Sequence, residues 1–307
     1  MYNTDAQTAL AFLISQLAHI ESQVNEIVYP DIQYQALIPV DTGAGEFAQT
    51  VTYYTSDKFG KAEWLNLNAD DIPLAGTEHS EHSVPIFDGG IGFAYSLKEL
   101  GLARHLGIDL TADRAAAARR AYEEMVDGVA MLGDATKGFQ GLINNTGITP
   151  VPAPTGDWGG TGVTADEILA DVHAAILDVA TATNFTSVAD TLLLPFDKLN
   201  VLATTRLPDT SMTILEFLRQ NNTYTAMTGA QLVIRGVRGL DTAGLAGVAR
   251  MVAYRRDPQV LKLHIPKVHT FGAPYMQGPL RVQVPGTFSL GGLDIRRPAE
   301  IKYVDGI

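Results

Sequence analysis

The stretch "TADRAAAARRAYEEMVDGVAMLGD", residues 111–134, is the strongest structural signal in the chain. Its apolar residues recur at spacings of three and four, which predicts an amphipathic helix over residues 111–132. These residues are Ala115, Ala118, Tyr122, Met125, Val129 and Leu132. Thr111 suits the cap position and Gly133 ends the pattern. The helix would be roughly 30 Å long at about 1.5 Å per residue, so it can cross a whole domain. We expect Met125 and Val129 to face a sheet.

The segments after this helix alternate in type. Residues 149–162, "TPVPAPTGDWGGTG", predict a Pro/Gly loop, and a Thr-x-x-Glu capping box at Thr164 opens a second amphipathic helix. Residues 190–204 predict a buried strand followed by a turn, and residues 211–222 a short helix. From residue 230 onward the sequence is rich in β-forming residues.

The region before the long helix divides into two parts. Residues 1–28 carry an apolar stripe at helical spacing, formed by Leu10, Leu13, Ile14, Leu17, Ile20, Val24 and Ile27. Tyr29-Pro30 ends this predicted helix, because the residue before a proline disfavours helical backbone angles. Residues 32–95 are rich in β-branched and aromatic residues and predict a long hairpin-like excursion.

The composition of the 307 residues limits the function. Apolar residues make up 46% of the chain, so we expect a large core in one domain or in two packed ones. The absence of cysteine excludes disulfides and thiolate metal sites. A formal charge of −12 argues against tight binding of nucleic-acid phosphates, which needs clustered Lys and Arg. The sequence shows no signal peptide and no apolar run of about 20 residues, so we expect a protein that is cytosolic where it is made.

Residues 36–47, "ALIPVDTGAGEF", match two short functional motifs. Asp41-Thr42-Gly43 is how an aspartic protease presents its catalytic carboxylate, and a near-copy occurs at Asp241-Thr242-Ala243. The copy lacks the glycine, and two predicted helices lie between the motifs, so a hydrolase is a distant alternative. Gly43-x-Gly45-x-x-Ala48 resembles a dinucleotide-binding loop, but a strand follows where a helix is required. A glycine-bearing turn, with Asp41 capping its own backbone, fits better.

The rest of the chain offers no coherent active site. His79 and His82 lie beside acids in "TEHSEHSVP", but at this spacing on a strand they point to opposite faces, so we expect no metal site. "GDATKG" lacks the Lys-Ser or Lys-Thr of a phosphate-binding loop. A large apolar content with a long excursion and a long helix suits a protein whose ligand is other copies of itself.

An ordered series of short motifs runs from residue 56 to residue 152. It consists of Asp57–Gly60, Asp70–Pro73, "VPIFDGGIGFAYS", Lys98–Leu100, the helix 111–132, Gly133-Asp134 and Gly138–Asn144. In this order the series resembles the major capsid proteins of tailed bacteriophages with the Hong Kong 97-type fold, in particular the encapsulin-like group. The resemblance is close over residues 35–155 and elsewhere rests on the order of elements.

This resemblance implies an α+β Hong Kong 97-type capsid fold. Its expected parts are an N-terminal arm (1–47), an extended loop with adjoining strands (48–95), a peripheral domain with spine helix 111–132 (96–184), an axial domain (185–255) and C-terminal strands that return to the peripheral domain (256–307). The implied function is that of a major capsid protein of a tailed double-stranded DNA phage. Such a protein assembles as hexamers and pentamers into an icosahedral shell, has no cofactor and is not an enzyme.

The resemblance also implies partners. These are other copies of the chain, a separate scaffolding protein, a portal and a decoration protein; the shell encloses DNA without tight or sequence-specific binding, and no membrane is involved. The protein would belong to the virion, and to the host cytoplasm during assembly. The alternative with the same fold is an encapsulin, a bacterial shell that packages a cargo enzyme, in which residues 5–28 would hold cargo on the inner wall.

Candidate contacts between subunits follow from position and charge. Three lie in the expected extended loop: Lys58, Lys61 and Trp64. Four are arginines with acids nearby, namely Arg104, Arg219, Arg255 and Arg256 beside Glu99, Glu216 and Asp257. Charge complementarity of this kind sets the register between subunits more than it sets affinity. We assign no catalytic, cofactor-binding or metal-ligating residue.

Overall fold

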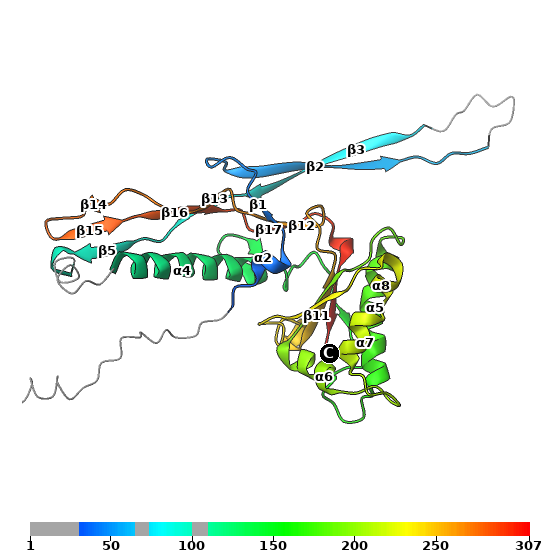
Figure 1. Ribbon diagram of the computed structural model, residues 1–307. Coiled ribbons are helices and arrows are strands. Elements are labelled where there is room, and N and C mark those ends of the chain that lie inside the picture. Colours follow the sequence, from blue (N-terminus) through cyan, green and yellow to red (C-terminus); the bar gives the residue numbers. More distant parts are fainter. Residues whose placement is uncertain (1–30, 65–73, 100–109) are drawn as a thin grey trace, which may run out of the picture. The chain divides into compact units, whose positions relative to one another are not determined.

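The computed structural model describes residues 31–64, 74–99 and 110–307 (Figure 1). The helix expected over residues 1–28 lies outside the described residues, as does Arg104. Residues Ile32–Ile307 form one compact unit.

The predicted long helix is present as α4 (Leu110–Leu132). It ends at Gly133, whose φ of 77° is the left-handed conformation that favours glycine. The short strands β6 (Gly133–Asp134) and β7 (Phe139–Gln140) then pair with each other. The buried residues of α4 are Ala118, Tyr122, Val126, Val129, Ala130 and Met131, so Val129 is buried as predicted.

The prediction that Met125 faces a sheet is wrong. Its side chain is 47% exposed, whereas that of Val126 is fully buried. The short helix α2 (Tyr34–Leu37) packs against α4, and two backbone N–H groups at its start donate to Asp127 Oδ1 at 2.9 Å each. This contact covers the side of α4 that carries Val126 and Asp127, and it leaves Met125 on the other side. Met125 and Val126 are both apolar, so spacing alone could not choose between them.

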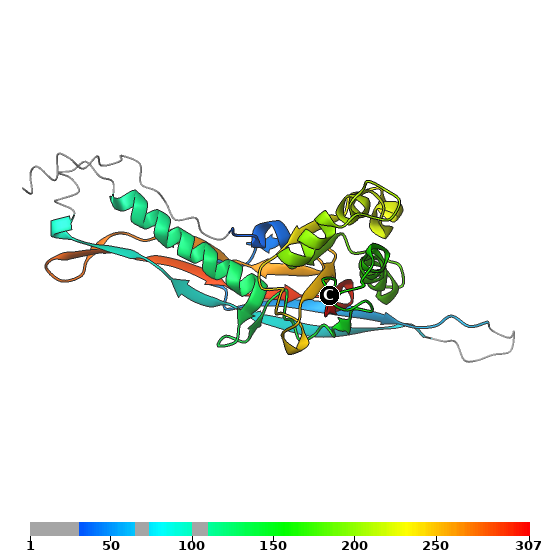
Figure 2. The ribbon, with the colours of Figure 1, turned by 90° about the horizontal axis from the view of Figure 1, so that it is seen from below.

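Strands from distant parts of the chain form the layer that α4 covers (Figures 1 and 2). One antiparallel sheet has the order β13-β16-β4 and another the order β14-β15-β5. Their bounds are β4 Phe87–Gly90, β5 Phe93–Ser96, β13 Lys267–Phe271, β14 Tyr275–Met276, β15 Arg281–Val284 and β16 Gly286–Leu290. Tyr122 of α4 stacks on His269 at 5.4 Å between ring centroids and meets Phe288 edge-on at 4.9 Å. An aromatic cluster therefore joins the helix to the strands.

A five-stranded sheet with the order β10-β9-β11-β18-β8 carries a core on each face. In β11, Met251 and Ala253 belong to one core, and Val252 and Tyr254 to the other. Burial on both faces explains why Met251, Val252 and Ala253 are consecutive apolar residues in this strand. The strand bounds are β8 Val151–Pro152, β9 Thr191–Leu194, β10 Val233–Gly236, β11 Arg250–Tyr254 and β18 Ile301–Asp305.

Helices cover one face of this sheet, and the other face joins the core under α4. The helices are α5 (Ala165–Ala182), α6 (Phe196–Thr204) and α7 (Ile214–Gln220), with α8 (Thr223–Thr228) against α5. The capping box at Thr164 is confirmed. The turn expected after the strand in residues 190–204 is wrong, because α6 follows there. Pro195 precedes that helix, a position where its missing N–H does no harm.

The C-terminal strand β18 lies inside the five-stranded sheet, antiparallel to β11 and parallel to β8. α5 also packs on β18 and β11. The expected division, which placed residues 96–184 and 256–307 in a domain apart from residues 185–255, stays a prediction. Pairing between strands so far apart in the chain leaves no local sequence signal.

The expected excursion is a hairpin of β2 (Thr50–Phe59) and β3 (Gly76–Pro85), in unbroken antiparallel register from Thr50↔Pro85 to Phe59↔Gly76. A small sheet with the order β1-β12-β17 lies at its root. The strands of this sheet are β1 (Val40–Asp41), β12 (Leu261–His264) and β17 (Leu293–Ile295).

Candidate intersubunit surfaces

The hairpin β2–β3 has the features of a segment that a partner covers. In β2 only Val51, Tyr53 and Thr55 are half-buried. The two strands pair with each other and with no third strand among the described residues. Three large aromatic side chains of the hairpin region are exposed, namely Tyr54 (69%), Phe59 (58%) and Trp64 (fully). A two-stranded ribbon is marginally stable alone, and aromatic residues are enriched in protein–protein interfaces.

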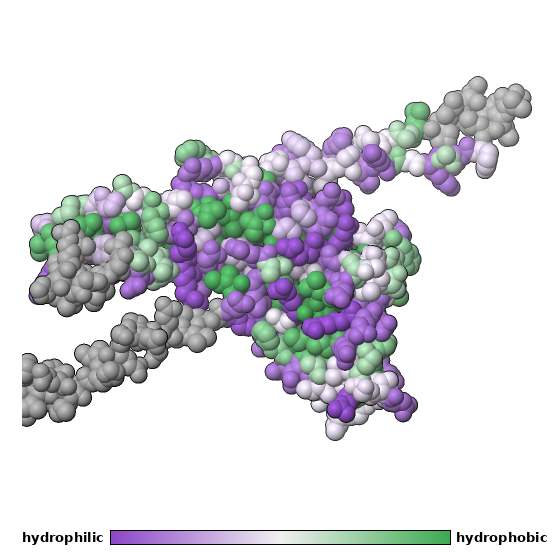
Figure 3. All heavy atoms as spheres, viewed as in Figure 1, coloured by the Kyte–Doolittle hydropathy of each residue, from purple (hydrophilic) through white to green (hydrophobic). Residues whose placement is uncertain are grey.

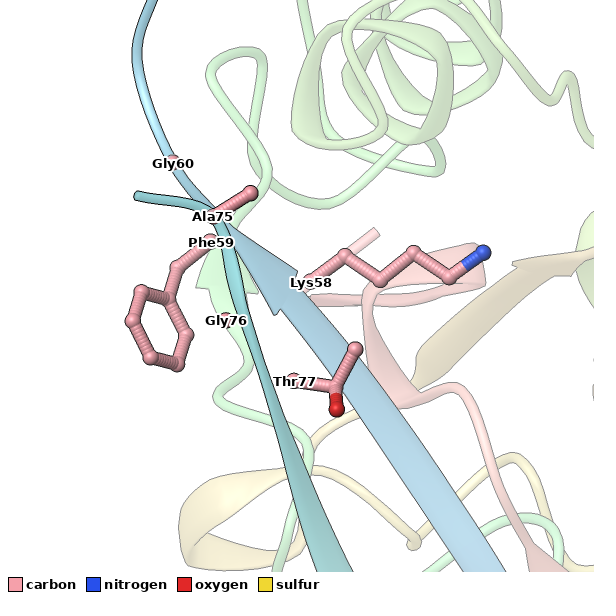
Figure 4. A pocket seen from close by; sticks show the side chains of 6 residues that line it. All are labelled: Lys58, Phe59, Gly60, Ala75, Gly76 and Thr77. Carbon is pink, nitrogen blue, oxygen red and sulfur yellow. The ribbon is translucent and has the colours of Figure 1, made fainter. Parts of the chain in front are cut away.

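The far end of the hairpin presents different chemistry on its two faces (Figure 4). The Phe59 ring covers Gly76, where a Cβ would clash with the ring. The Lys58 side chain leaves the opposite side of the strand. Lys61 and Trp64 follow β2 and are exposed. Lys58 therefore lies on the face opposite Phe59, and Lys61 and Trp64 follow it along the chain.

The root of the hairpin is held by a cluster of charged side chains. The Arg296 guanidinium lies 4.2 Å from the centroid of the Tyr53 ring and donates to Asp294 at 2.9 Å. His264 is 1% exposed, with Nε2 3.3 Å from Asp294 Oδ2 and Nδ1 3.6 Å from Asp41 Oδ2. Burial raises the pKa of Asp294, but the hydrogen bonds with His264 and Arg296 outweigh it, so the pKa lies below its usual value. This cluster fixes the point from which β2 extends.

Asp41, the acid of the protease-like motif, belongs to the same cluster. Its Oδ1 accepts a hydrogen bond from the Gly43 N–H at 2.9 Å, which confirms the predicted turn. Its Oδ2 lies 3.3 Å from Lys262 Nζ. The Gly43 hydrogen bond lowers the pKa of Asp41, helped by Lys262 and opposed by burial. A protease dyad needs two facing carboxylates that share a proton; Asp41 instead faces a cation and a histidine, and this gives the hydrolase alternative no support.

The two histidines of the polar segment lie on β3. His82 stacks on Tyr53 of β2 at 5.2 Å between ring centroids, and His79 pairs across the ladder with Ser56. Among residues 31–64, 74–99 and 110–307, no group of three His, Cys, Asp or Glu side chains could hold a metal ion. Over the same ranges, no helix has the length and apolar character to cross a membrane.

The four arginine candidates have different surroundings. Arg255 is ion-paired with Asp257 of its own chain at 3.0 Å. Arg256 donates to a backbone carbonyl of α2 at 3.1 Å. Arg219 lies exposed in the last turn of α7, and Arg104 lies outside the described residues. Arg255 and Arg256 therefore have contacts within the subunit, although Arg256 is exposed, as Arg219 is.

Sequence reasoning missed a set of exposed apolar side chains outside the hairpin. They are Met125 and Leu132 on α4, Tyr275, Met276 and Leu280 at β14–β15, and Phe185, Phe196, Met227 and Leu245 on the side of the helices. Figure 3 shows hydrophobic surface over the region of β14 and β15, at the left. The available signal was large apolar residues in predicted turns, such as Leu280 in "QGPL".

Comparison with known proteins assigns the chain. A family model described as "Major capsid protein" matches residues 60–307. The chain belongs to the major capsid protein family. No curated protein sequence matches it.

Several solved capsids share the fold of this capsid protein. The capsid of Myoviridae phage XM1 has a TM-score of 0.80 at 18% identity, covering 95% of this chain and 98% of that one. The capsid of a native GTA particle has a TM-score of 0.66 at 10% identity, covering 97% of this chain and 98% of that one. The structure of Microbacterium phage Oxtober96 has a TM-score of 0.59 at 14% identity, covering 96% of this chain and 97% of that one.

The capsid-protein resemblance and the Hong Kong 97-type fold expected from the sequence are therefore confirmed, and so is the expected role of a major capsid protein. As a capsid protein, the chain is a structural component of the virion and assembles with copies of itself.

Proposed function

We propose that this capsid protein forms the icosahedral head of a tailed double-stranded DNA phage, as hexamers and pentamers in which the hairpin β2–β3 lies over a neighbouring subunit. The hairpin is the observation that supports this most directly. Each strand contributes ten paired residues, and the described contacts with the rest of the subunit include those of Tyr53 and of Tyr54, Thr55 and Ser56, which line a pocket with Pro258 and Gln259. A closed shell supplies the surface that the exposed aromatics need.

Within this shell, the strands and helix around α4 act as the peripheral domain. The five-stranded sheet with α5–α8 acts as the axial domain, with β18 added to it. Lys58, Lys61 and Trp64 contact the neighbouring subunit, and Arg219 is the arginine we retain as an intersubunit contact.

The shell confines DNA because it is closed, and it does not bind the DNA phosphates tightly. The net charge is −12, and residues 1–57 contain no Lys or Arg. Counterion release on phosphate binding requires clustered cations. In a filter-binding titration at physiological salt, unassembled subunits should show no sub-micromolar affinity for duplex DNA. Affinity in that range would refute this part of the proposal.

The chain has no enzymatic role in this proposal. A separate scaffolding protein directs assembly in the host cytoplasm, and a portal and a decoration protein complete the head. An encapsulin shares the fold, so the contents of particles purified from the native source should distinguish a phage head from an encapsulin. A phage head contains DNA and a portal, whereas an encapsulin contains a cargo enzyme.

The test uses a triple variant, Tyr54→Ser/Phe59→Ser/Trp64→Ser. All three side chains are exposed in the subunit, so its circular dichroism and unfolding temperature should stay close to those of the unchanged protein. In sedimentation velocity experiments the unchanged protein should sediment as capsomers or shells, and the triple variant should sediment as unassembled subunits. A matched control changes one exposed aromatic outside the hairpin, Phe196→Ser. Shells of normal yield from the triple variant would contradict the proposed role of the hairpin.

A further inference from the structure

A buried histidine lies between two carboxylates at the root of the hairpin. His264 on β12 is 1% exposed. Its Nε2 lies 3.3 Å from Asp294 Oδ2, and its Nδ1 lies 3.6 Å from Asp41 Oδ2. Both ring nitrogens of His264 therefore face a carboxylate oxygen.

This arrangement suits the doubly protonated form of the ring. A neutral imidazole carries one N–H, and its second nitrogen presents a lone pair. In either neutral tautomer that lone pair would face a carboxylate oxygen, which is an unfavourable contact at a site buried from water. The imidazolium carries a proton on both nitrogens, so it can donate to Asp294 and attract Asp41 at the same time.

Two cations of the cluster act against a proton on the ring. Lys262 Nζ lies 3.3 Å from Asp41 Oδ2, and Arg296 Nε lies 2.9 Å from Asp294 Oδ2. Each cation contacts the same oxygen atom that faces His264, so each carboxylate is shared between two basic groups. The two cations balance the two carboxylates, and the protonation of His264 therefore sets the net charge of the cluster.

Both carboxylates connect His264 to the hairpin. Asp41 belongs to β1, which precedes β2 in the chain. Burial raises the pKa of Tyr53 on β2, and so does its hydrogen bond with Asp294, so the neutral phenol donates to that carboxylate. The Tyr53 ring stacks on His82 of β3 at 5.2 Å between ring centroids. A change at His264 can therefore reach both strands of the hairpin.

The backbone around His264 holds the ring in place. The His264 N–H donates to the Gly292 carbonyl at 3.2 Å, and the His264 carbonyl accepts from the Gly291 N–H at 2.8 Å. A Cβ at Gly291 would lie 2.9 Å from the His264 Cβ, so the neighbouring backbone passes close to this side chain. The carboxylates, and the strands connected to them, are therefore the parts that move if the ring loses its proton.

We propose that His264 is held as an imidazolium in the folded subunit and acts as a proton-dependent latch for the hairpin β2–β3. With the proton, the ring holds Asp41 and Asp294 together and fixes the root of the hairpin. Without it, one nitrogen presents a lone pair to a carboxylate and the root loosens. The latch is complete above about pH 4, where carboxylates are ionised, and is lost as the pH rises and the ring releases its proton. It belongs to a single subunit, so it does not depend on the proposed function.

The first measurement needs no variant. In the unassembled subunit with ¹⁵N-labelled histidine, long-range ¹H–¹⁵N correlation spectra distinguish an imidazolium from either neutral tautomer. At about pH 7.5 an exposed histidine is neutral in about nine molecules of ten, whereas His264 should show two protonated nitrogens. A neutral His264 ring at that pH would overturn the proposal.

The second measurement follows the hairpin. The chain has no cysteine, so Ser80→Cys and Ser211→Cys introduce two sites for spin labels, one exposed on β3 and one exposed before α7. Double electron–electron resonance gives the distribution of distances between the two labels. This distribution should be narrow while the spectra show the His264 imidazolium, and broader once they show a neutral ring. An equally narrow distribution in both forms would overturn the latch.

A matched pair of variants separates His264 from the other histidines. His264→Gln removes the titrating ring and should give the broader distribution at every pH. His79→Gln changes an exposed histidine of β3 and should behave as the unchanged protein does. A narrow distribution in His264→Gln would show that the hairpin does not depend on the ring, and would overturn the proposal.

A third variant keeps the test independent of whether His264→Gln folds. Asp41→Asn removes one of the two carboxylates, so His264 should lose its proton at a lower pH than in the unchanged protein. The spin-label distribution should broaden at that same lower pH. A His264 titration that is unchanged by Asp41→Asn would contradict the role of the paired carboxylates.

Discussion

At the scale of single residues, paired buried charges hold distant parts of the subunit together. Arg250 and Asp305 are joined by hydrogen bonds of 2.6 and 2.9 Å, and their side chains are 6% and 8% exposed. Arg250 also donates to the Ile143 carbonyl at 2.8 Å, and its guanidinium lies 4.4 Å from the centroid of the Tyr303 ring. These contacts join β11 and β18 to the loop after β7.

Arg250→Ala should destabilise the subunit by about 3–5 kcal/mol, because it leaves the Asp305 carboxylate buried without its cation. Denaturant unfolding of the unassembled subunit measures this. The double variant Arg250→Met/Asp305→Leu removes both charges and should be less destabilised than the single variant. A double variant that is no more stable than Arg250→Ala would show that the unpaired charge is not the cause.

The cluster at the hairpin root predicts a dependence of stability on pH. The pKa of Asp294 is lowered in the folded state, as is that of Asp41. Stabilisation from such carboxylates is complete above the unfolded value of about 4 and is lost as the pH falls through the folded value. The unfolding temperature should therefore decrease as the pH drops below about 4. The variant Asp294→Asn should show a smaller decrease over this pH range and a lower stability at neutral pH. An acid profile identical to that of the unchanged protein would contradict the role of Asp294.

At the scale of elements, the rotation of α4 about its axis is set by what packs on it. Val126 is fully buried and its neighbour Met125 is 47% exposed. Val126→Asp buries a charge without a partner and should prevent soluble folding. Met125→Asp makes a similar change one residue away and should change the free energy of unfolding by only about 1 kcal/mol. Circular dichroism and solubility measurements on the two variants test this. If both variants fold equally well, the assignment of Val126 to the core and of Met125 to the surface is refuted.

Local patterns predicted the elements better than their partners. The helix 111–132, the Thr164 cap and the hairpin each leave a periodic or capping signal in one stretch, and each is present. The exposure of Met125 depends on α2, which is distant in sequence, and the partners of β18 are equally remote. No local signal could supply either.

The candidate contacts illustrate the same limit. Arg255 beside Asp257 has the sequence pattern of a contact between subunits, yet the pair also satisfies itself within one chain. Asp41 resembled a catalytic acid because three residues matched a motif, whereas its partners Lys262 and His264 lie more than 200 positions away. The hairpin residues Lys58, Lys61 and Trp64 remain predictions, since only an assembled shell shows what they contact.

At the scale of the whole molecule, one subunit leaves several surfaces that its own core does not use. Two cores share the five-stranded sheet and bury most large apolar residues. The hairpin aromatics, Met125 and Leu132 of α4 and the turn at β14–β15 stay outside both. Exposed large apolar residues of this kind are expected where neighbouring subunits cover them.

Electron cryomicroscopy of particles assembled from the purified protein tests the central claim most directly. We expect closed shells of hexamers and pentamers, with density for β2–β3 lying on a neighbouring subunit and covering Tyr54, Phe59 and Trp64. Particles in which the hairpin folds back on its own subunit, or a preparation that stays monomeric at high concentration with an ordered hairpin, would contradict it.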